Sequence, residues 1–268
     1  MNYAAEDLRP HIAQTLRANV LGVGVSAIDM EAAVRLSDSL VRSRQRGYVC
    51  VTGVHGVMEA QSDPSLKRIL NRSFMTTPDG MPMVWVGKLQ GHRGMRRVYG
   101  PDFMLDFCRF SVERGYRHFL YGGNDGVADH LARELTRQIP GLQIVGTYTP
   151  PFRPLSPVEE RDLIDFVART KPDAFWVGLS TPKQERFMAD YLDKLDVKLM
   201  VGVGAAFDIH TGKIKDAPRW VKQAGLQWLH RLSQEPQRLW RRYLVNNPKF
   251  MWKFGSQFFR LRKFEIES

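Results

Sequence analysis

The sequence predicts an α/β fold of Rossmann-like type, with a mostly parallel sheet flanked by helices and a basic helical C-terminal appendage. Short apolar runs that resemble buried strands alternate with amphipathic stretches. Helix start signals accompany this alternation: Ser156 precedes Pro157, and Thr181 precedes Pro182. Ser and Thr before a proline are typical of a helix N-cap and first turn. Strands that alternate with helices of such length form βαβ units, whose parallel strands are covered on both faces.

The elements follow in order along the chain. The expected strands are Val20–Val25, Tyr48–Thr52, Phe74–Thr77, His118–Tyr121, Gln143–Tyr148, Ala174–Leu179 and Lys198–Val203. The expected helices are Met30–Ser43, Pro101–Arg114, Gly126–Gln138, Pro157–Thr170 and Pro182–Leu195. Ser156 and Thr181 are expected to cap the last two of these helices through their hydroxyl groups.

The composition fits a packed domain in a reducing compartment. A chain of 268 residues with 43% hydrophobic residues suits one α/β domain with an appendage. Its apolar runs fall short of the ~20 residues that a membrane-spanning helix needs, and the N-terminus has no apolar segment typical of a secretory signal. The two cysteines lie far apart in apolar surroundings, which favours buried thiols and a cytoplasmic protein.

The positive charge of the chain is concentrated in its tail. The net charge is +11, and residues 211–268 hold thirteen Lys and Arg residues against four Asp and Glu residues. We therefore expect an N-terminal extension over residues 1–18, an α/β core over 19–211 and a basic, aromatic, helical appendage over 212–268. Nucleic acid and anionic lipid both attract such a segment, and charge alone does not choose between them.

Aromatic residues in the tail favour a membrane surface. Asn247 and Pro248 are typical of a helix start, and an apolar stripe at helical spacing follows them. The stripe contains Phe250, Phe254, Phe258, Leu261 and Phe264. A basic amphipathic helix with aromatic residues suits the interface of an anionic membrane. The alternative is that the stripe packs on the protein's own core or on another subunit, as in a homo-oligomer. Nucleic-acid binding is the rival function, but the tail carries no known binding motif.

Polar residues and glycines gather where the expected strands end. Ligands of open α/β sheets bind beyond the carboxyl ends of the strands. Five segments at such ends share this composition: Thr52–His55, Pro78–Gly80, Gly122–Asp125, Ser180–Gln184 and Gly204–Asp208. Their coincidence predicts a ligand site at this edge of the sheet.

Asp79 and Arg97 are the candidate catalytic residues. Asp79 follows an expected strand and precedes an apolar run, where desolvation raises the pKa of a carboxyl group and suits it to act as a general base. The alternative is that Asp79 caps the next helix. Arg97 lies in a basic, glycine-rich loop. A guanidinium group there suits a diphosphate, and the alternative is a solvated charge.

The remaining candidates are substrate-binding residues. Gly122 and Gly123 allow backbone to approach a phosphate at a helix N-terminus, or they simply make a tight turn. Lys183 and Gln184 open a helix, where donors can reach a diphosphate or ribose or remain in solvent. His55 follows a strand end and is expected to line the pocket. The sequence lacks His or Cys pairs at metal-ligand spacing and lacks an Asp-x-Asp motif, so neither a metal nor a cofactor is expected.

Several segments resemble the WecG/TagA/CpsF glycosyltransferase family from about Asn19 to Tyr243. The carrying segments are Asn19–Val23, Pro78–Trp85, Arg97–Asp102, Tyr121–Gly123, Val177–Glu185, Gly202–Asp208, Ala217–Trp220, Gly225–Leu229 and Glu235–Leu239. So many matching segments in one order are highly specific for the family, although they do not fix the sugar.

The resemblance implies an inverting transferase that moves a hexose-type sugar from a UDP-sugar donor to a polyprenyl-diphosphate-linked sugar. It implies that Asp79 is the base, that Arg97 binds diphosphate, and that Thr52, Gln184 and Asp208 lie in substrate-binding segments. It also implies a bacterial enzyme that makes cell-surface glycans, without metal, peripherally bound at the cytoplasmic face of the membrane.

The segment after Thr52 departs from the family pattern. Gly53, Val54 and His55 stand where the family usually carries an asparagine. This departure favours glucose over a sugar of the N-acetylmannosamine type, and an exopolysaccharide as the product.

Overall fold

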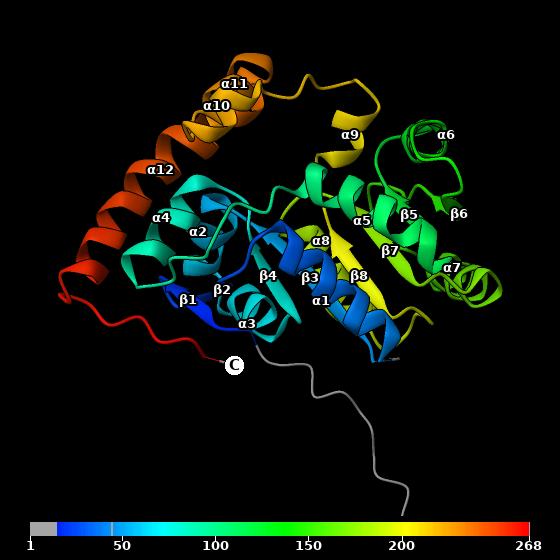
Figure 1. The fold of residues 1–268 in the computed structure, drawn as a ribbon, viewed down its shortest axis with the longest axis horizontal. Coiled ribbons are helices and arrows are strands. Elements are labelled where there is room, and N and C mark those ends of the chain that lie inside the picture. The colour runs from blue at the N-terminus through cyan, green and yellow to red at the C-terminus, as the bar shows by residue number, and fades with distance from the viewer. Residues whose placement is uncertain (1–14, 44, 268) are drawn as a thin grey trace, which may run out of the picture.

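The computed structural model describes residues 15–43 and 45–267. Within these ranges the chain forms a six-stranded parallel sheet in the order β4-β3-β8-β7-β5-β6 and a two-stranded antiparallel hairpin (Figure 1). The strands are β1 (Arg17–Val20), β2 (Val23–Ser26), β3 (Gly47–Thr52), β4 (Met75–Pro78), β5 (Arg117–Gly122), β6 (Gln143–Tyr148), β7 (Ala174–Gly178) and β8 (Leu199–Gly202). The predicted α/β fold with its parallel sheet is confirmed.

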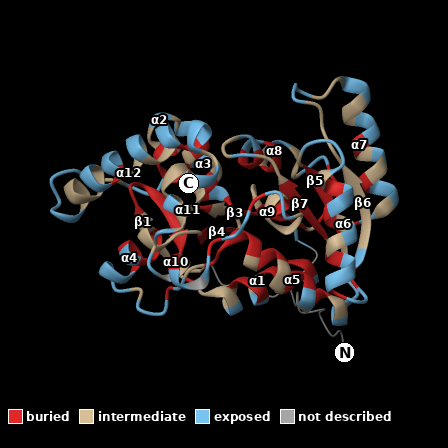
Figure 2. Cartoon of the chain, turned by 90° about the horizontal axis from the view of Figure 1, so that it is seen from above, coloured by how far each residue is buried: buried red, intermediate tan, exposed pale blue. Residues whose placement is uncertain are grey.

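Helices cover both faces of the sheet. They are α1 (Met30–Arg42), α2 (Val54–Ser62), α3 (Pro64–Arg72), α4 (Met81–Leu89), α5 (Gly100–Arg114), α6 (Val127–Gln138), α7 (Pro157–Thr170), α8 (Lys183–Tyr191), α9 (Ala206–His210), α10 (Arg219–Gln223), α11 (Gln227–Gln234) and α12 (Pro236–Phe258). One face packs on α1, α5, α6 and α9, and the other on α2, α3, α7 and α8. Figure 2 shows the strands mostly buried between helices whose outer sides are exposed.

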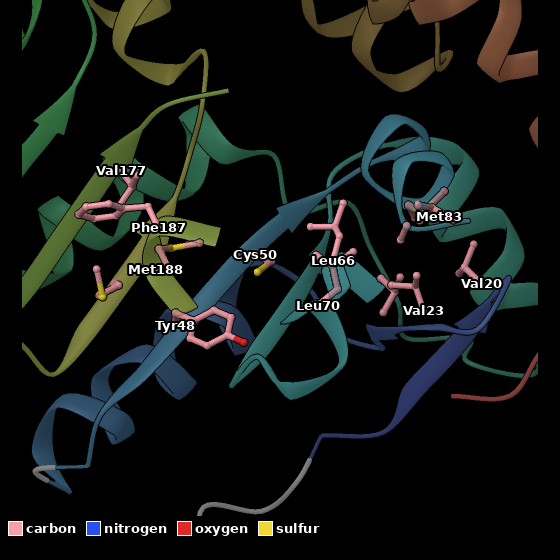
Figure 3. Packing of buried hydrophobic residues seen from close by; sticks show 14 of the residues in the cluster. Val20, Val23, Tyr48, Cys50, Leu66, Leu70, Met83, Val177, Phe187 and Met188 are labelled. Atoms are coloured by element: carbon pink, nitrogen blue, oxygen red, sulfur yellow. The ribbon is translucent and has the colours of Figure 1, made fainter. Parts of the chain in front are cut away.

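The alternation of side chains along the strands builds two cores. Phe175 and Val177 of β7 point to one face, and Ala174 and Trp176 point to the other. Figure 3 shows Val177 beside Phe187 in the first core. Each large side chain buried in this way stabilises the fold by about 1.5–3 kcal/mol. Because both faces of the sheet are buried, the strands are continuous apolar runs in the sequence, as is usual for a parallel sheet.

The prediction of a single strand at Val20–Val25 is wrong. This segment contains the end of β1, a two-residue turn and most of β2, with positive φ angles at the turn residues Leu21 (54°) and Gly22 (82°). Two successive residues at positive φ fit a two-residue hairpin turn. The Asn19 side chain accepts a hydrogen bond from the Gly22 amide at 2.8 Å. A Cβ atom at Gly22 would lie 2.8 Å from the Glu265 carbonyl oxygen, so the position needs glycine.

One predicted helix cap is confirmed and one is wrong. The Ser156 hydroxyl accepts a hydrogen bond from the Glu159 amide, and the Glu159 carboxylate accepts one from the Ser156 amide, which makes a capping box at α7. Thr181 does not cap α8, since that helix begins at Lys183. The Thr181 hydroxyl instead donates to the Glu185 carboxylate at 2.9 Å.

The tail helix does not begin at Asn247 and Pro248, as the sequence predicted. Instead, α12 runs without interruption from Pro236 to Phe258 and includes Pro248. A proline inside a helix removes one backbone hydrogen bond. Packing on both sides of Pro248 offsets this cost, because Leu239 and Phe250 are 2% exposed.

The apolar stripe of the tail is divided between the core and the surface. Phe250, Phe254 and Phe264 pack against the core, as the alternative reading of the stripe anticipated, whereas Phe258 and Leu261 are exposed. In Figure 1, α12 passes beside α2 and α4 and the chain then returns along β1.

Hydrogen bonds hold this last segment on the hairpin. The Asn19 amide group donates to the Phe264 carbonyl at 2.6 Å, and the Gln257 side chain accepts from the Leu21 amide at 3.0 Å. We call residues 259–267 the strap. The expected boundary at residue 211 falls between α9 and α10, and residues 1–14 of the expected extension lie outside the described residues.

We predict that the appendage helix contributes to the stability of the whole fold. Phe250→Ala should lower the free energy of unfolding by about 3–5 kcal/mol, because it leaves a cavity under α12. Trp252→Ala is the matched control, since that side chain is 82% exposed, and it should change the value by less than about 0.5 kcal/mol. Chemical denaturation measures both. Equal effects would mean that α12 does not depend on the core.

Candidate active site

A pocket of about 430 Å³ lies between the sheet and the appendage. Its walls come from the end of β3, from α2 and α4, from the loop before α5, and from α10, α11 and α12. A smaller hollow of about 100 Å³ adjoins it over the ends of β7 and β8. The two share the lining residues Val51, Asp79, Tyr99, Thr181, Arg231 and Arg242. They therefore form one site with two parts, at the carboxyl ends of the strands as predicted.

Asp79 stands where the two parts meet. Its backbone amide extends the ladder of β4 by donating to the Thr52 carbonyl at 3.1 Å. The side chain is 29% exposed, and one carboxylate oxygen is buried without a hydrogen-bond partner among the described residues. Burial raises the pKa of Asp79 to about 6, against the opposing effects of Arg97, the Gly100 amide and the appendage arginines. Asp79 does not cap α4, because Gly80 is the N-cap residue.

Arg97 is fixed in the pocket wall instead of being solvated. Its side chain is 13% exposed, and its Nη2 atom lies 4.0 Å from an Asp79 oxygen. The guanidinium group lies 4.3 Å from the centre of the Tyr99 ring and donates a hydrogen bond to Gln227 of α11. Tyr99 in turn donates to Asp216 at 3.1 Å. The loop before α5 is thus held against the appendage, with the Arg97 charge beside Asp79.

Three arginines of the appendage face the same site. Arg231 and Arg242 line both parts of the pocket, and Arg238 lines the smaller one. Glu235 pairs with Arg231 at 2.8 Å and with Arg238 at 2.6 Å. Within the described ranges, Arg242 has no acidic side chain at ion-pair distance. Such a charge inside a pocket favours an anionic ligand, and a guanidinium group suits a diphosphate.

None of these three arginines was predicted by number as a site residue, because the charge of the tail was expected mainly at a membrane surface. One feature of the sequence does group two of them: Arg238 and Arg242 are four residues apart and therefore share a face of the helix. That spacing indicates one charged side of a helix, but it does not indicate what the side faces.

His55 links the pocket wall of α2 to α12. Burial, together with Arg242, lowers the pKa of its imidazole to about 3, so the ring is neutral. Its Nδ1 atom lies 3.4 Å from the Asn246 amide nitrogen and 3.6 Å from the Glu59 carboxylate. His55 lines the larger part of the pocket, where the sequence placed it.

Thr52 and Gln184 bring buried polar atoms to the strand ends. Gln184 lines the smaller part of the pocket and donates to the Glu185 carboxylate at 3.0 Å. Thr52 is 2% exposed at the end of β3. The Thr52 hydroxyl and the Gln184 carbonyl oxygen have no partner among the residues described. Unpaired buried polar atoms are rare in proteins and are compatible with a ligand that completes them.

Five predicted residues lie outside the lining of the two parts of the pocket: Thr52, Gly122, Gly123, Lys183 and Asp208. Gly122 and Gly123 follow β5 with φ angles of 124° and 77°. A Cβ atom on Gly122 would lie 2.7 Å from the Gly178 backbone, so close strand packing accounts for this glycine. Lys183 opens α8, and Asp208 pairs with Lys213 at 3.4 Å. Their substrate-binding roles stay predictions.

The described part of the chain shows neither a metal-binding cluster nor a membrane-spanning helix. It contains no cluster of three or more His, Cys, Asp and Glu side chains that could hold a metal ion. Among its helices, none is both long enough and apolar enough to cross a membrane.

The fold and site define an α/β enzyme whose pocket combines one desolvated carboxylate with several guanidinium groups. Residues 18–264 match the glycosyl transferase WecG/TagA/CpsF family, and the chain belongs to that family. The resemblance drawn from the sequence is confirmed, and the protein is a glycosyltransferase.

Two relatives bear the name N-acetylglucosaminyldiphosphoundecaprenol N-acetyl-beta-D-mannosaminyltransferase. The Bacillus spizizenii protein is 31% identical over 193 residues, which cover 72% of each chain. The Bacillus subtilis protein is 30% identical over 183 residues, which cover 68% of each chain.

Proposed function

We propose that the protein is an inverting glycosyltransferase that moves a hexose-type sugar from a UDP-sugar donor to a polyprenyl-diphosphate-linked sugar. The observation that carries the proposal is the desolvated Asp79 carboxylate beside the guanidinium groups of Arg97, Arg231 and Arg242. The names of the two Bacillus relatives support a diphosphate-linked lipid acceptor.

The chemistry follows from the position of Asp79 between the two parts of the pocket. Asp79 accepts the proton of the acceptor hydroxyl, and the hydroxyl oxygen bonds to the anomeric carbon of the donor. The bond from that carbon to the UDP oxygen breaks, and UDP leaves with the electron pair. Attack and departure on opposite faces invert the anomeric centre. A base with a pKa near 6 is mostly ionised at neutral pH, as this step requires.

The arginines have two anionic groups to stabilise. Negative charge grows on the UDP diphosphate as the glycosidic bond breaks, and the acceptor carries a diphosphate of its own. Positioned guanidinium groups in a site of low water content stabilise such charge strongly. Arg242, which lacks a carboxylate partner among the described residues, and Arg238, which donates to Ser180 at 3.4 Å, are placed for these contacts.

The identity of the donor sugar separates two versions of this proposal. The Gly53–His55 segment favours glucose and an exopolysaccharide product, because it lines the pocket and lacks the asparagine that the family usually carries after the strand-end threonine. The relatives' names favour N-acetylmannosamine. A donor screen with UDP-glucose and UDP-N-acetylmannosamine distinguishes the two.

We also propose that the enzyme binds peripherally to the cytoplasmic face of the cell membrane through its appendage. Large apolar side chains are exposed on this part of the chain: Trp220, Leu229, Trp240, Leu244, Trp252, Phe258, Phe259 and Leu261. Basic residues accompany them at Lys249, Lys253, Arg260, Arg262 and Lys263. Aromatic and basic side chains together suit an anionic lipid surface better than nucleic acid.

We predict that Asp79→Asn lowers turnover by at least ~100-fold, because the variant cannot accept the proton. Its affinity for UDP should stay within severalfold of wild type. Asp196→Asn is the control, since that carboxylate is 62% exposed and precedes β8 at the opposite end of the sheet. Steady-state kinetics and titration calorimetry with UDP measure the effects. Normal turnover by a folded Asp79→Asn protein would remove Asp79 from the mechanism.

We predict that the protein floats with vesicles that contain anionic lipid and that added salt weakens this binding, because the attraction is partly electrostatic. Trp252→Ser together with Phe259→Ser should reduce the bound fraction, since both side chains are exposed. Exposed Phe152, which precedes α7 and lies outside the appendage, provides the control Phe152→Ser. Equal binding to neutral and anionic vesicles, or equal effects of all substitutions, would argue against this attachment.

A further inference from the structure

The outer half of the pocket is an apolar groove. One wall is α4, which contributes Met81, Pro82 and Trp85. The opposite wall is α12, which contributes Phe250 and Met251. Leu226 of the turn between α10 and α11 and Trp228 of α11 also line the pocket. We call these seven residues the apolar groove.

The groove continues from the charged part of the site without a break. Met81 is two residues from Asp79, so the apolar wall begins beside the proposed base. Met81, Trp85 and Leu89 are spaced by four residues and share a face of α4, over about 12 Å of helix. Trp85 is 48% exposed and Leu89 is 61% exposed. An apolar strip therefore leads from the base towards the surface.

The side chains that α12 contributes to the pocket also change from charged to apolar with distance from Asp79. Arg242 lines both parts of the pocket, whereas Asn247 and Met251, which follow it on α12, line only the larger part. Arg242 and Met251 are separated by about 13 Å along the helix. Met251 is 64% exposed although it is apolar. Both walls thus pass from charged to apolar with distance from Asp79.

We propose that the apolar groove binds the first isoprene units of the lipid acceptor. This inference rests on the proposed function, in which the acceptor carries a diphosphate on a polyprenyl chain. With the acceptor diphosphate at the arginines and its sugar hydroxyl at Asp79, the chain leaves along the groove. A UDP-sugar has no aliphatic chain that would cover an apolar strip of this length. A concave groove continuous with the base also differs from the convex apolar surface that a membrane contact needs.

The test uses water-soluble acceptors that share one sugar diphosphate and carry prenyl chains of increasing length, without membranes or detergent. For the wild type, the KM for the acceptor should fall as the chain lengthens, because each added unit buries apolar surface. Trp85→Gln and Met251→Gln should each remove most of this fall, raising the KM for the longest acceptor about fivefold to twentyfold. The ratio of variant to wild-type KM should increase with chain length and be smallest for the shortest acceptor.

Trp252→Gln and Phe259→Gln are the matched controls, since both residues are exposed apolar side chains of the same appendage outside the pocket lining. They should keep the wild-type dependence on chain length. A wild-type KM that is independent of chain length, or control variants that behave like Trp85→Gln, would overturn the groove assignment. Failure of the proposed function would give a different result from failure of the groove assignment. In that case no UDP-sugar would be transferred to a diphosphate-linked acceptor of any length.

Discussion

The rest of the site depends on the partly desolvated carboxylate of Asp79. Removing a carboxylate from water is costly unless positive charge or hydrogen bonds compensate for it. Arg97 and the Gly100 amide make the larger contributions to that compensation, and Arg231 and Arg242 of the appendage add smaller ones. The pKa of about 6 is the balance of these effects. The charges that act on Asp79 therefore come from both the core and the appendage.

The position of the appendage therefore determines part of the charge and shape of the site. Phe250 fixes α12 on the core, and Asn19 of the hairpin binds both Phe264 of the strap and Gln257 of α12. These contacts hold Arg242 over the strand ends while other side chains of the same helix remain exposed. One element thus completes the charged part of the pocket and provides a wall for the apolar groove. The same element presents apolar and basic groups on the outside, in keeping with a substrate that has a polar head and a lipid chain.

Most of the fold could be predicted from the sequence, because the signals are local. The buried strands of a parallel sheet are continuous apolar runs, and the capping box at Ser156 marks a helix start by chemistry within four residues. The errors occurred where tertiary contacts override local signals. Gly22 is fixed by the distant strap, and α12 continues through Pro248 because core packing supports it.

The candidate site could be predicted only in part for the same reason. Asp79, His55 and Gln184 were found because strand ends converge at one edge of a parallel sheet, whatever the remaining details of the fold. Arg97 was found from its basic, glycine-rich loop and from the family resemblance. Arg231 and Arg242 were not assigned to the site, since nothing in a basic helical segment tells which way it faces. Only the packing of α12 beside α2 turns that charge inward.

The measurement that tests this account most directly is the pH dependence of kcat/KM on a water-soluble, short-chain acceptor. The wild type should lose activity as the pH falls through about 6, because Asp79 must be ionised to act as the base. Arg242→Gln should move this acidic limb to higher pH, since the Arg242 charge lowers the pKa of Asp79. Arg241→Gln, which changes a neighbouring exposed arginine, should leave the limb in place. An acidic limb that is unchanged in Arg242→Gln, or that moves equally in Arg241→Gln, would contradict a shared site of core and appendage.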